Sequence, residues 1–334
     1  MKIFPLTPKR LSRAFQRLVI DRAASAGLLP PWRRPAHHAV FAAFPPPPEV
    51  APGNIETDYL GTRTQPQMRP KRWTPPPWPM SLPIPAFSEE YFEWIDLLEA
   101  VQAAHGSFTM LELGAGYGRW SVRGALAARR RGLTVRLGAA EAEPQHVIWL
   151  REHLAFNGIS QSECDVIEAA ISDRRGTTVF YVSMPDGYAG NTAQDWYGQA
   201  IVAGDIDTSA APTAEIYFGR PLVPLPGGWK GVEVATIPLA EVLDRYEFVD
   251  FSDFDIQGEE LSAIGSALDA LGRKVRRLHI GTHSREIDAG LKKLLDAEGW
   301  QCLRAHSCLR WNRTEFGWIS FGDGVQSWIN PRLT

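Results

Sequence analysis

Residues 110–120 read Met-Leu-Glu-Leu-Gly-Ala-Gly-Tyr-Gly-Arg-Trp, an apolar run that passes through three alternating glycines into an arginine-rich segment. The apolar run predicts a buried strand, and the segment after it predicts a helix. Gly114, Gly116 and Gly118 can adopt positive φ angles and carry no Cβ atom, so the backbone can turn sharply between the two elements. The amide groups of such a loop can approach a ligand at the helix N-terminus. The stretch therefore predicts a cofactor loop.

The spacing of the glycines indicates which cofactor this loop binds. Dinucleotide folds use G-x-G-x-x-G, whereas the third glycine here comes one residue earlier. Glu112 stands two residues before the first glycine, where a carboxylate suits a ligand with an ammonium and a sulfonium group. The pattern resembles the first motif of the S-adenosylmethionine (SAM) dependent methyltransferases. The residues expected to bind SAM here are Glu112, Gly114, Ala115, Gly116, Tyr117 and Gly118.

The composition is that of a soluble globular protein. The chain has 334 residues, 44% hydrophobic and 22% charged, with a net charge of −3. This charge predicts no general nucleic-acid surface, so no nucleic-acid partner is expected. No window approaches the roughly 18 apolar residues of a membrane span, and the first residues lack the apolar run of a secretory signal. Three cysteines without metal-ligand spacing indicate reduced thiols, and we expect a cytoplasmic protein.

Residues 1–87 form a region of distinct composition. Sixteen of the 26 prolines lie between Pro30 and Pro85, which excludes a helix or a central strand and predicts an extended arm. Upstream, apolar side chains recur at helical spacing among basic ones from Lys9 to Ala26. This basic helix either contacts a membrane surface or a partner, or packs on its own domain or a second subunit. The arm thus offers a contact for a homodimer, and its tryptophans and tyrosines favour a docked segment.

From residue 88 to residue 334, strand-like and helical runs alternate. Repeated β-then-α units predict an α/β, doubly wound Rossmann-like sheet of the class I methyltransferase type. We expect seven mostly parallel strands and an antiparallel edge strand, because strands at 301–305 and 317–321 have no helix between them. The other predicted strands are 108–113, 133–141, 165–171, 177–182, 248–256 and 275–280, and the predicted helices are 119–131, 144–156, 259–271 and 284–298.

Ligands of such sheets lie at the carboxyl ends of the strands, so residues that follow strands are the candidates for binding. Glu143 directly precedes the proline that starts a helix, and we favour it over Glu141 as the acceptor of the ribose hydroxyls. The alternative is an ordinary solvated glutamate. The small residues at 169–171 leave room for an adenine ring, with Ala170 and Asp173 as its expected contacts.

Alternating acids end the strand near residue 255. Asp253 and Asp255 point the same way at a period of two. Asp255 is a candidate general base or acceptor of a substrate hydroxyl proton, whereas the plainer interpretation is a helix cap. A divalent metal held by the two aspartates is a further option, although without a third ligand no metal is predicted. His283, at a strand end, suits proton transfer, while His279 within the strand is expected only to pack.

A stretch from residue 183 to residue 232 lacks clear periodicity and follows the third-strand hairpin. Long irregular stretches in compact domains are commonly lids or binding loops. Its aromatic side chains either stack on an acceptor or fill a satellite core. We name Asn191, Trp196 and Tyr197 as candidate substrate contacts.

Several motifs together are similar to the FkbM-like family of SAM-dependent methyltransferases over about residues 108–321. They are Glu112 to Gly118, Glu143-Pro144, Asn157-Gly158, Ala169 to Asp173 with Arg175-Gly176, and Asp253 to Glu260, in that order. The resemblance implies O-methylation of hydroxyl groups on sugars, polyketides and related molecules. It also implies that Gly114, Gly116, Gly118 and Glu143 bind SAM, and that Asp255, Gly258 and Glu260 lie at the core of the site. This chain departs from the family pattern at Gly116, Asp253 and Gln257.

The leading hypothesis is therefore a SAM-dependent O-methyltransferase with a small-molecule or glycan acceptor. A methyltransferase acting on protein or RNA, docked through the arm, is the second hypothesis. A SAM-binding protein without turnover is the third. The catalytic candidates common to the two enzyme hypotheses are Asp255, His283 and Glu260.

Overall fold

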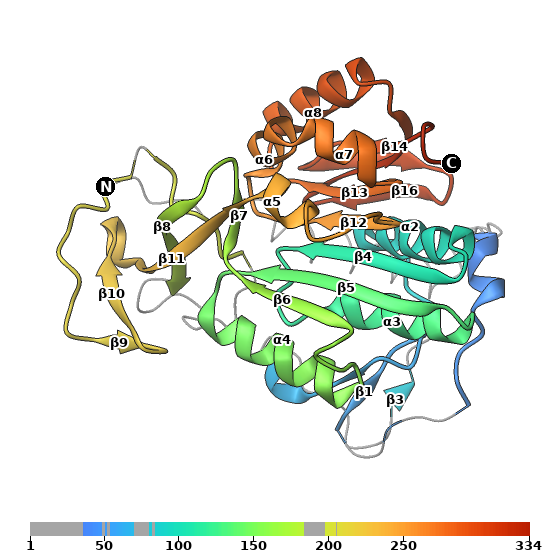
Figure 1. The fold of residues 1–334 in the computed structure, drawn as a ribbon, viewed down its shortest axis with the longest axis horizontal. Coiled ribbons are helices and arrows are strands. Elements are labelled where there is room, and N and C mark those ends of the chain that lie inside the picture. The colour runs from blue at the N-terminus through green and yellow to red at the C-terminus, as the bar shows by residue number, and fades with distance from the viewer. Residues whose placement is uncertain are drawn as a thin grey trace, which may run out of the picture.

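The computed structural model describes residues 36–48, 51, 54–69, 80–81, 84–183, 198–204 and 206–334. Figure 1 shows a large twisted sheet flanked by helices and a second, smaller sheet that extends from one end of it. The three cysteines are free thiols, as expected. The basic helix predicted for residues 9–26 lies outside the described residues.

The elements follow the chain in this order. The helices are η1 (Ala39–Ala43), η2 (Pro66–Met68), α2 (Glu89–Ala103), α3 (Arg119–Arg130), α4 (Pro144–Phe156), η4 (Pro226–Gly228), α5 (Leu239–Leu243), α6 (Glu260–Ser266), α7 (Leu268–Lys274) and α8 (Arg285–Ala297). The strands up to the second sheet are β1 (Glu56–Thr57), β2 (Arg63–Thr64), β3 (Met80–Ser81), β4 (Ser107–Leu113), β5 (Thr134–Glu141), β6 (Cys164–Glu168), β7 (Ala170–Ser172) and β8 (Gly176–Ser183). The remaining strands are β9 (Ile216–Tyr217), β10 (Arg220–Pro224), β11 (Lys230–Pro238), β12 (Phe251–Phe254), β13 (Arg277–Thr282), β14 (Gln301–His306), β15 (Arg310–Thr314), β16 (Gly317–Phe321) and β17 (Gly324–Ile329).

The main sheet has seven strands in the order β14-β17-β13-β12-β4-β5-β6. Its central strands pair in parallel, and β17 runs antiparallel to both β13 and β14. This is the doubly wound arrangement of the class I methyltransferase fold, which confirms the predicted fold class. One strand assignment was wrong: residues 317–321 form β16, which pairs with β15 in a separate hairpin. The antiparallel strand is β17, which lies one place in from the edge.

Two hydrophobic cores lie on opposite faces of this sheet. Alternation along β4 and β5 sends Met110 and Leu137 into a core with α2, α3 and α4. The same alternation sends Leu111 and Ala140 into a core with α5, α6, α7 and α8. Because successive side chains of a strand point to opposite faces, a strand with a core on each face carries apolar residues at consecutive positions, such as Met110-Leu111 in β4 and Ala139-Ala140 in β5. The result is a three-layer α/β/α domain.

Parts of the proline-rich arm pack into the first of these cores. Phe41, Tyr59 and Leu60 are buried there beside α2 and α3. A buried ion pair of 2.8 Å joins Asp58 Oδ2 to Arg123 Nε of α3. The expectation of a docked arm is therefore confirmed for residues 36–48 and 54–69.

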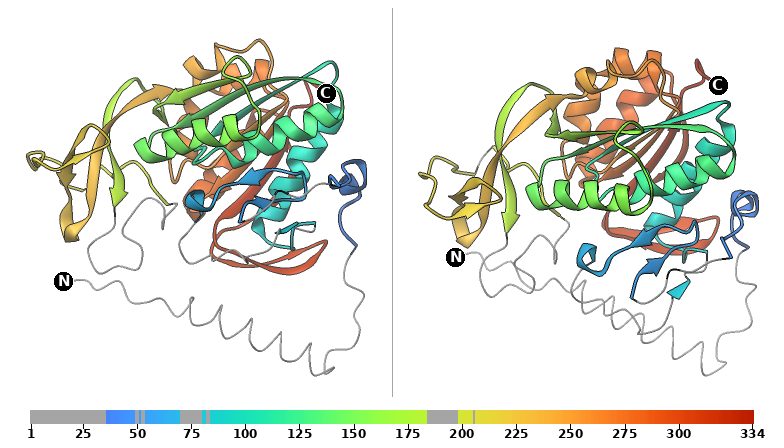
Figure 2. Two further views of the ribbon diagram at one scale, coloured as in Figure 1. Left: turned by 90° about the horizontal axis from the view of Figure 1, so that it is seen from below. Right: turned by 60° about the horizontal axis from the view of Figure 1, so that its bottom comes forward.

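The second sheet is built partly from the stretch at 183–232 that lacks clear periodicity and partly from the strands that flank it. Its order is β7-β11-β10-β9, and β8 pairs with β11. The predicted strand 165–171 is split, because β6 belongs to the main sheet and β7 pairs with β11. Figure 2 shows this sheet extending away from the main sheet in both views. Residues 216–232 therefore form strands for the most part, and the aromatic segment 184–197 lies outside the described residues.

We predict that Gly138→Ala destabilises the fold by about 1–3 kcal/mol through overpacking. A Cβ atom on Gly138, in the middle of β5, would lie 2.3 Å from the Tyr246 hydroxyl oxygen and 2.7 Å from a Leu111 methyl group. Gly204→Ala is the control, because nothing lies within 4 Å of the position of its added Cβ atom. Urea unfolding measures both variants, and equal midpoints for Gly138→Ala and the parent would contradict the packing described here.

Candidate functional site

The glycine loop leaves β4 and enters α3 in a conformation that requires glycine. Gly114, Gly116 and Gly118 have positive φ angles of 86°, 55° and 76°. A Cβ atom on Gly114 would lie 1.9 Å from the carbonyl oxygen of Asp255, the residue after β12. The Gly114 amide donates to the Ala140 carbonyl oxygen of β5 at 3.0 Å. The loop is thereby held between the ends of β5 and β12, the two strands on either side of β4.

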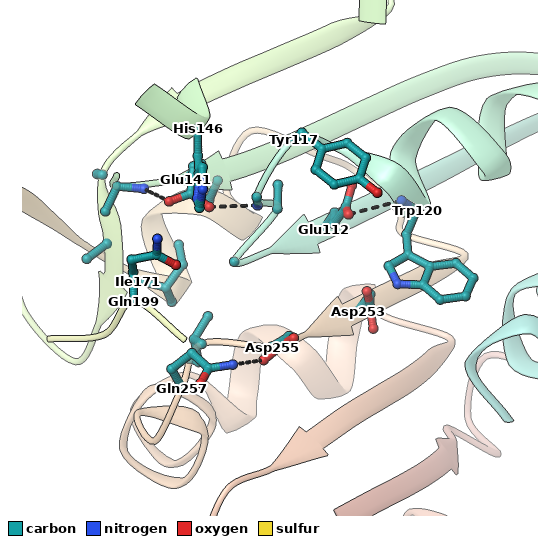
Figure 3. A pocket seen from close by; sticks show the side chains of 18 of the residues that line it. Glu112, Tyr117, Trp120, Glu141, His146, Ile171, Gln199, Asp253, Asp255 and Gln257 are labelled. Atoms are coloured by element: carbon teal, nitrogen blue, oxygen red, sulfur yellow. Dashed lines mark hydrogen bonds between the residues drawn. The ribbon is translucent and has the colours of Figure 1, made fainter. Parts of the chain in front are cut away.

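A cavity of about 370 Å³ opens above this loop, at the carboxyl ends of β4, β5, β6 and β12. Figure 3 shows side chains reaching it from opposite walls, with Glu112 and Glu141 on one side and Asp253 and Asp255 on the other. The predicted residues that line it are Glu112, Gly114, Ala115, Gly116, Tyr117, Ala170 and Asp255. The cavity therefore lies where ligands of open α/β sheets bind.

Glu112 joins the end of β4 to the first turn of α3. Its carboxylate is buried and accepts hydrogen bonds from the Trp120 and Ser121 amides at 3.1 and 2.7 Å. Burial raises the pKa of Glu112 to about 7. Free amides at a helix N-terminus attract an anion, which explains why an acid is tolerated here. The side chain borders the cavity and also holds the helix in place.

The acid at the end of β5 that lines the cavity is Glu141, whereas we favoured Glu143. Glu141 Oε2 accepts from the Gly116 amide at 2.6 Å, and its Oε1 accepts from the amides of Ala142 and Glu143 at 2.8 and 2.7 Å. Burial raises the pKa of Glu141 to about 8. Its carboxylate thus lies directly against the glycine loop.

Glu143 is instead the N-cap of α4, with a fully buried side chain outside the cavity. Its Oε2 accepts from the His146 amide at 2.7 Å. Its Oε1 accepts from the Tyr217 hydroxyl of β9 at 2.7 Å. Glu143 directly precedes a proline at the first helical position, and residues at that place are helix caps. It therefore joins the second sheet to α4.

The side of the cavity away from Asp253 is formed by small and apolar groups. Ala170 lines it together with Ala169 and Ile171, and Phe180 of β8 closes it from the second sheet. Asp173 does not line the cavity. It is exposed, with a carboxylate 3.5 Å from Arg174, because the chain turns away from the main sheet after β7. Gly118, the N-cap of α3, also lies outside the lining, with its Cβ position 2.3 Å from Leu150.

Acids gather on the wall formed by β12 and α2. Asp253 is buried, and burial raises its pKa to about 6. It shares a hydrogen bond with Glu93 of α2, whose pKa is raised well above its usual range by burial and by Asp253. Two adjoining carboxyl groups with raised pKa values are a common feature of functional sites.

Asp255, His283 and Glu260 form a connected set behind this wall. His283 Nε2 lies 3.2 Å from Asp255 Oδ1, and its Nδ1 lies 2.8 Å from Glu260 Oε1. Burial acts to lower the pKa of His283, but the two carboxylates outweigh it and raise this pKa to about 11. In the same way, burial acts to raise the pKa of Asp255, and its contact with His283 brings it below the usual range.

These pKa shifts bear on the role predicted for His283. A pKa raised to about 11 favours the protonated imidazole at neutral pH, whereas a general base must be unprotonated. Neither His283 nor Glu260 lines the cavity, whereas Asp255 does. Asp255 is not a helix cap, because the N-cap of α6 is Glu259. His279 is buried within β13 as expected, and its Nδ1 also lies 2.7 Å from Asp96 Oδ2.

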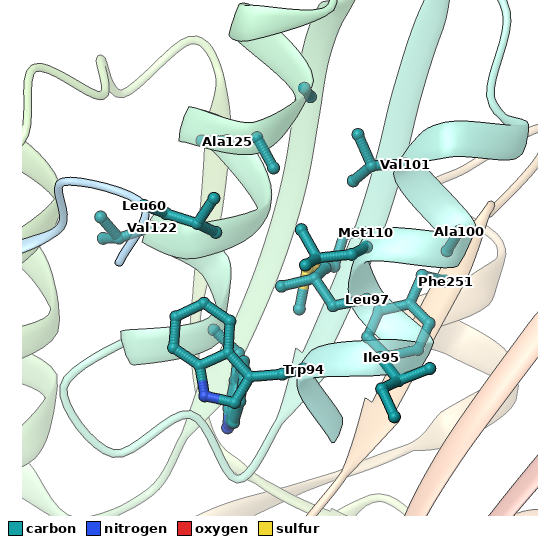
Figure 4. Close-up of a cluster of buried hydrophobic side chains, with 14 of the residues drawn as sticks. Leu60, Trp94, Ile95, Leu97, Ala100, Val101, Met110, Val122, Ala125 and Phe251 are labelled. Atoms are coloured by element: carbon teal, nitrogen blue, oxygen red, sulfur yellow. The ribbon is translucent and has the colours of Figure 1, made fainter. Parts of the chain in front are cut away.

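One ion pair that lines the cavity was not predicted from the sequence. Arg119 lies 3.0 Å from Glu90, and both line the cavity. The position of Arg119 directly after Gly118 could have indicated that its side chain lies near the ligand of the glycine loop. Glu90 comes from α2, far from the loop in sequence, and the packing of α2 on α3 and β4 brings it there. Figure 4 shows that packing, with Leu97 of α2 beside Met110 of β4.

Three predicted substrate residues, Asn191, Trp196 and Tyr197, lie outside the described residues. Within the described ranges, no group of three or more His, Cys, Asp or Glu side chains is arranged to hold a metal ion. None of the helices in those ranges has the length and apolar content that a membrane span requires.

Comparisons with known proteins relate the chain to methyltransferases. No family model matches it. The chain is similar to a protein of Jannaschia sp. (strain CCS1) that is named a putative methyltransferase. The two are 29% identical over 219 residues, which are 65% of this chain and 71% of that protein. Membership of the FkbM-like family stays a prediction.

Solved structures show weak likeness. An FkbM methyltransferase from Methylobacillus flagellatus KT is 14% identical with a TM-score of 0.40, over 73% of this chain and 56% of that chain. An O-methyltransferase from Bacillus cereus in complex with SAH is 15% identical with a TM-score of 0.36, over 74% and 84%. An rRNA methylase from Streptococcus thermophilus is 10% identical with a TM-score of 0.40, over 73% and 98%. Likenesses this weak carry no argument about function.

We predict that His283→Gln reduces the loss of stability at alkaline pH. The folded protein holds the His283 proton up to a pKa of about 11, whereas an unfolded histidine releases it near pH ~6.5. Between these values the folded state binds more protons, so its free energy of unfolding falls as pH rises, by up to about 1.4 kcal/mol per pH unit. Urea unfolding at neutral and alkaline pH compares the two proteins. Equal pH slopes would show that His283 is not held as an imidazolium.

Proposed function

We propose that this protein is a SAM-dependent methyltransferase that methylates a hydroxyl group on a sugar, a polyketide or another small molecule or glycan. The observation that carries the proposal is the cavity between the glycine loop and the end of β12, with Glu141 against the loop and acids on the opposite wall. The relatedness to the Jannaschia protein supports it. The acceptor class rests on the resemblance to the FkbM-like family.

The residues around the loop fit the nucleoside part of SAM. Three backbone amides occupy part of the Glu141 carboxylate, two on Oε1 and one on Oε2. A carboxylate offers about four acceptor positions, so Oε2 keeps capacity for a ribose hydroxyl. Ala170, Ile171 and Phe180 offer an apolar slot of the kind that an adenine ring requires.

The acidic wall fits the amino-acid part of SAM, which carries an ammonium and a sulfonium charge. Glu90, Glu112 and Asp253 line this part of the cavity. The raised pKa values of Glu112 and Asp253 show that their negative charges are under-compensated in the protein, and a bound cation would stabilise them. Arg119, beside Glu90, is placed to bind the carboxylate of the same group.

Bound SAM would supply the activated methyl group. We assign Asp255 as the acceptor of the substrate hydroxyl proton, because it lines the cavity and directly follows β12. The His283 imidazolium, held by buried Glu260, keeps Asp255 ionised and therefore able to accept a hydrogen bond from a hydroxyl. His283 and Glu260 act as positioning residues, and the wall formed by β12 keeps Asp255 oriented toward the cavity.

The ribose assignment is tested with a matched pair of variants. We expect Glu141→Gln to weaken SAM binding at least tenfold, because glutamine replaces one acceptor oxygen with an NH2 donor and can no longer accept from the backbone amides on both sides and from a ribose hydroxyl. Glu143→Gln is expected to change the affinity less than threefold, because Glu143 lies outside the cavity. Isothermal titration calorimetry measures both. A larger loss of SAM affinity in Glu143→Gln than in Glu141→Gln would indicate that Glu143, and not Glu141, binds the ribose hydroxyls.

The reaction is tested by incubating the full chain with SAM labelled in the methyl group and with cell extract. The extract is then separated into small-molecule, glycan, protein and RNA pools. We expect label in the small-molecule or glycan pool. Label in protein or RNA would contradict the proposed small-molecule or glycan acceptor. SAM binding without any methyl transfer would contradict the proposal that the protein is an enzyme.

Asp255→Asn is the informative variant in this assay. It is expected to lower turnover about 10²–10⁴-fold while SAM affinity changes little, the usual size of effect for a general base. The parent's turnover should stay nearly constant from mildly alkaline to mildly acidic pH, because the pKa of Asp255 is low. A fall in turnover near pH ~6.5 would instead point to a neutral histidine as the base.

A further inference from the structure

The hairpin of β15 and β16 presents an apolar face outside the main sheet. Its register pairs Trp311 with Ser320 and Arg313 with Trp318, so these four side chains share one face. The opposite face carries Ile319 and is buried against the domain. Trp318 is 66% exposed and Trp311 is 40% exposed. Exposed apolar side chains that gather on one face, rather than lying singly, often mark an interaction site.

Leu309 extends this face in a conformation that leucine rarely adopts. It precedes β15 with a φ of 57°, in the left-handed region, and is 50% exposed. Glycine or asparagine would occupy such a turn with less strain, and leucine there also exposes apolar surface to water. Both costs are offset if the side chain enters an apolar environment, and strained residues of this kind often mark functional positions.

The charges on the hairpin are positive. Arg310 and Arg313 are both exposed, and neither forms an ion pair with another described residue. The acid of the hairpin, Glu315 at its tip, lies 3.6 Å from Arg304 of β14. We define the hairpin face as Leu309, Trp311, Arg313 and Trp318. Arg310 lies beside this face, on the other side of β15, and is also exposed. The face and its border therefore combine two tryptophans, a leucine and two arginines that form no ion pair with another described residue.

We propose that the hairpin face docks on a membrane surface that contains anionic lipids. Tryptophan suits the membrane interface because its ring is apolar and its N–H group reaches the headgroups, and arginine is attracted by lipid phosphates. A second copy of the chain is a poorer occupant. A stable dimer requires roughly 800 Å² and 20–30 residues from each partner, whereas this face consists of Leu309, Trp311, Arg313 and Trp318.

The hairpin face is joined to the cavity through the first turn of α2. Phe316, between β15 and β16, packs against Tyr91 with ring centroids 4.9 Å apart. The carboxylate of Glu89 accepts a hydrogen bond from the Gly322 amide that follows β16. The next residue, Glu90, lines the cavity. Docking through the hairpin would therefore bring the cavity near the membrane, although the docking itself does not depend on the proposed chemistry.

The test is flotation of the full chain with two kinds of vesicle, phosphatidylcholine alone and phosphatidylcholine mixed with phosphatidylglycerol. We expect binding to the mixed vesicles that weakens with added salt. The double variant Trp311→Ser/Trp318→Ser should lose at least tenfold in affinity. Arg310→Glu/Arg313→Glu should lose the preference for phosphatidylglycerol. Failure of the parent to bind the mixed vesicles would overturn the proposal.

A matched control uses exposed apolar residues elsewhere. Ile148 of α4 and Ile216 of β9 are 42% and 60% exposed, so Ile148→Ser/Ile216→Ser removes comparable apolar surface and should bind vesicles like the parent. Equal loss in this control would overturn a specific role of the hairpin. Two further outcomes would identify other occupants. A dimer that dissociates in Trp311→Ser/Trp318→Ser would indicate a second copy, and vesicle binding only after removal of residues 1–35 would indicate that segment.

Discussion

The close approach of Gly114 to the backbone of Asp255 is the constraint on which the site depends. β4 and β12 are neighbours, and their parallel register sets Glu112 beside Asp253 and Leu113 beside Phe254. One residue further, the two chains come so close that no Cβ atom fits between them. The same register that requires glycine also places two acids side by side in the interior. The sharp turn and the acidic wall are thus two consequences of a single pairing.

Burial is what gives these acids their chemical character. Glu112, Glu141 and Asp253 all have raised pKa values, and burial is the largest cause for each. Burial also acts to raise the pKa of Asp255, but its hydrogen bond and charge contact with His283 outweigh it and bring this pKa below the usual range. Carboxyl groups of the same cavity are therefore separated into those that would gain from a bound cation and one that stays ionised without it.

Local signals allowed much of this site to be predicted from sequence. The proline at 144 marks the start of α4 at the correct residue, and the alternating glycines identify the loop. The rule that ligands bind at the carboxyl ends of strands located the cavity. The sequence did not indicate that Glu141 lines the cavity and that Glu143 does not, because residues two apart at a strand end differ only in which way the chain turns. Glu90 could not be predicted as a cavity residue from the sequence, because only the packing of α2 brings it to the loop. The second sheet was not predicted as a separate unit, although a strand was predicted at 177–182, because β7 follows β6 directly along the chain and only its pairing with β11 assigns it to another sheet.

The position of β17 bears on how the chain acquires its structure during synthesis. It is the last strand in chain order, yet it lies between β13 and β14 and pairs with both along its length. Until it emerges from the ribosome, β13 has an open edge and β14 has no place in the sheet. The half of the sheet that contains β4, β5 and β6 has no such dependence and can assemble earlier. Folding is thus expected to proceed outward from the glycine-loop half, with an exposed strand edge awaiting the final segment.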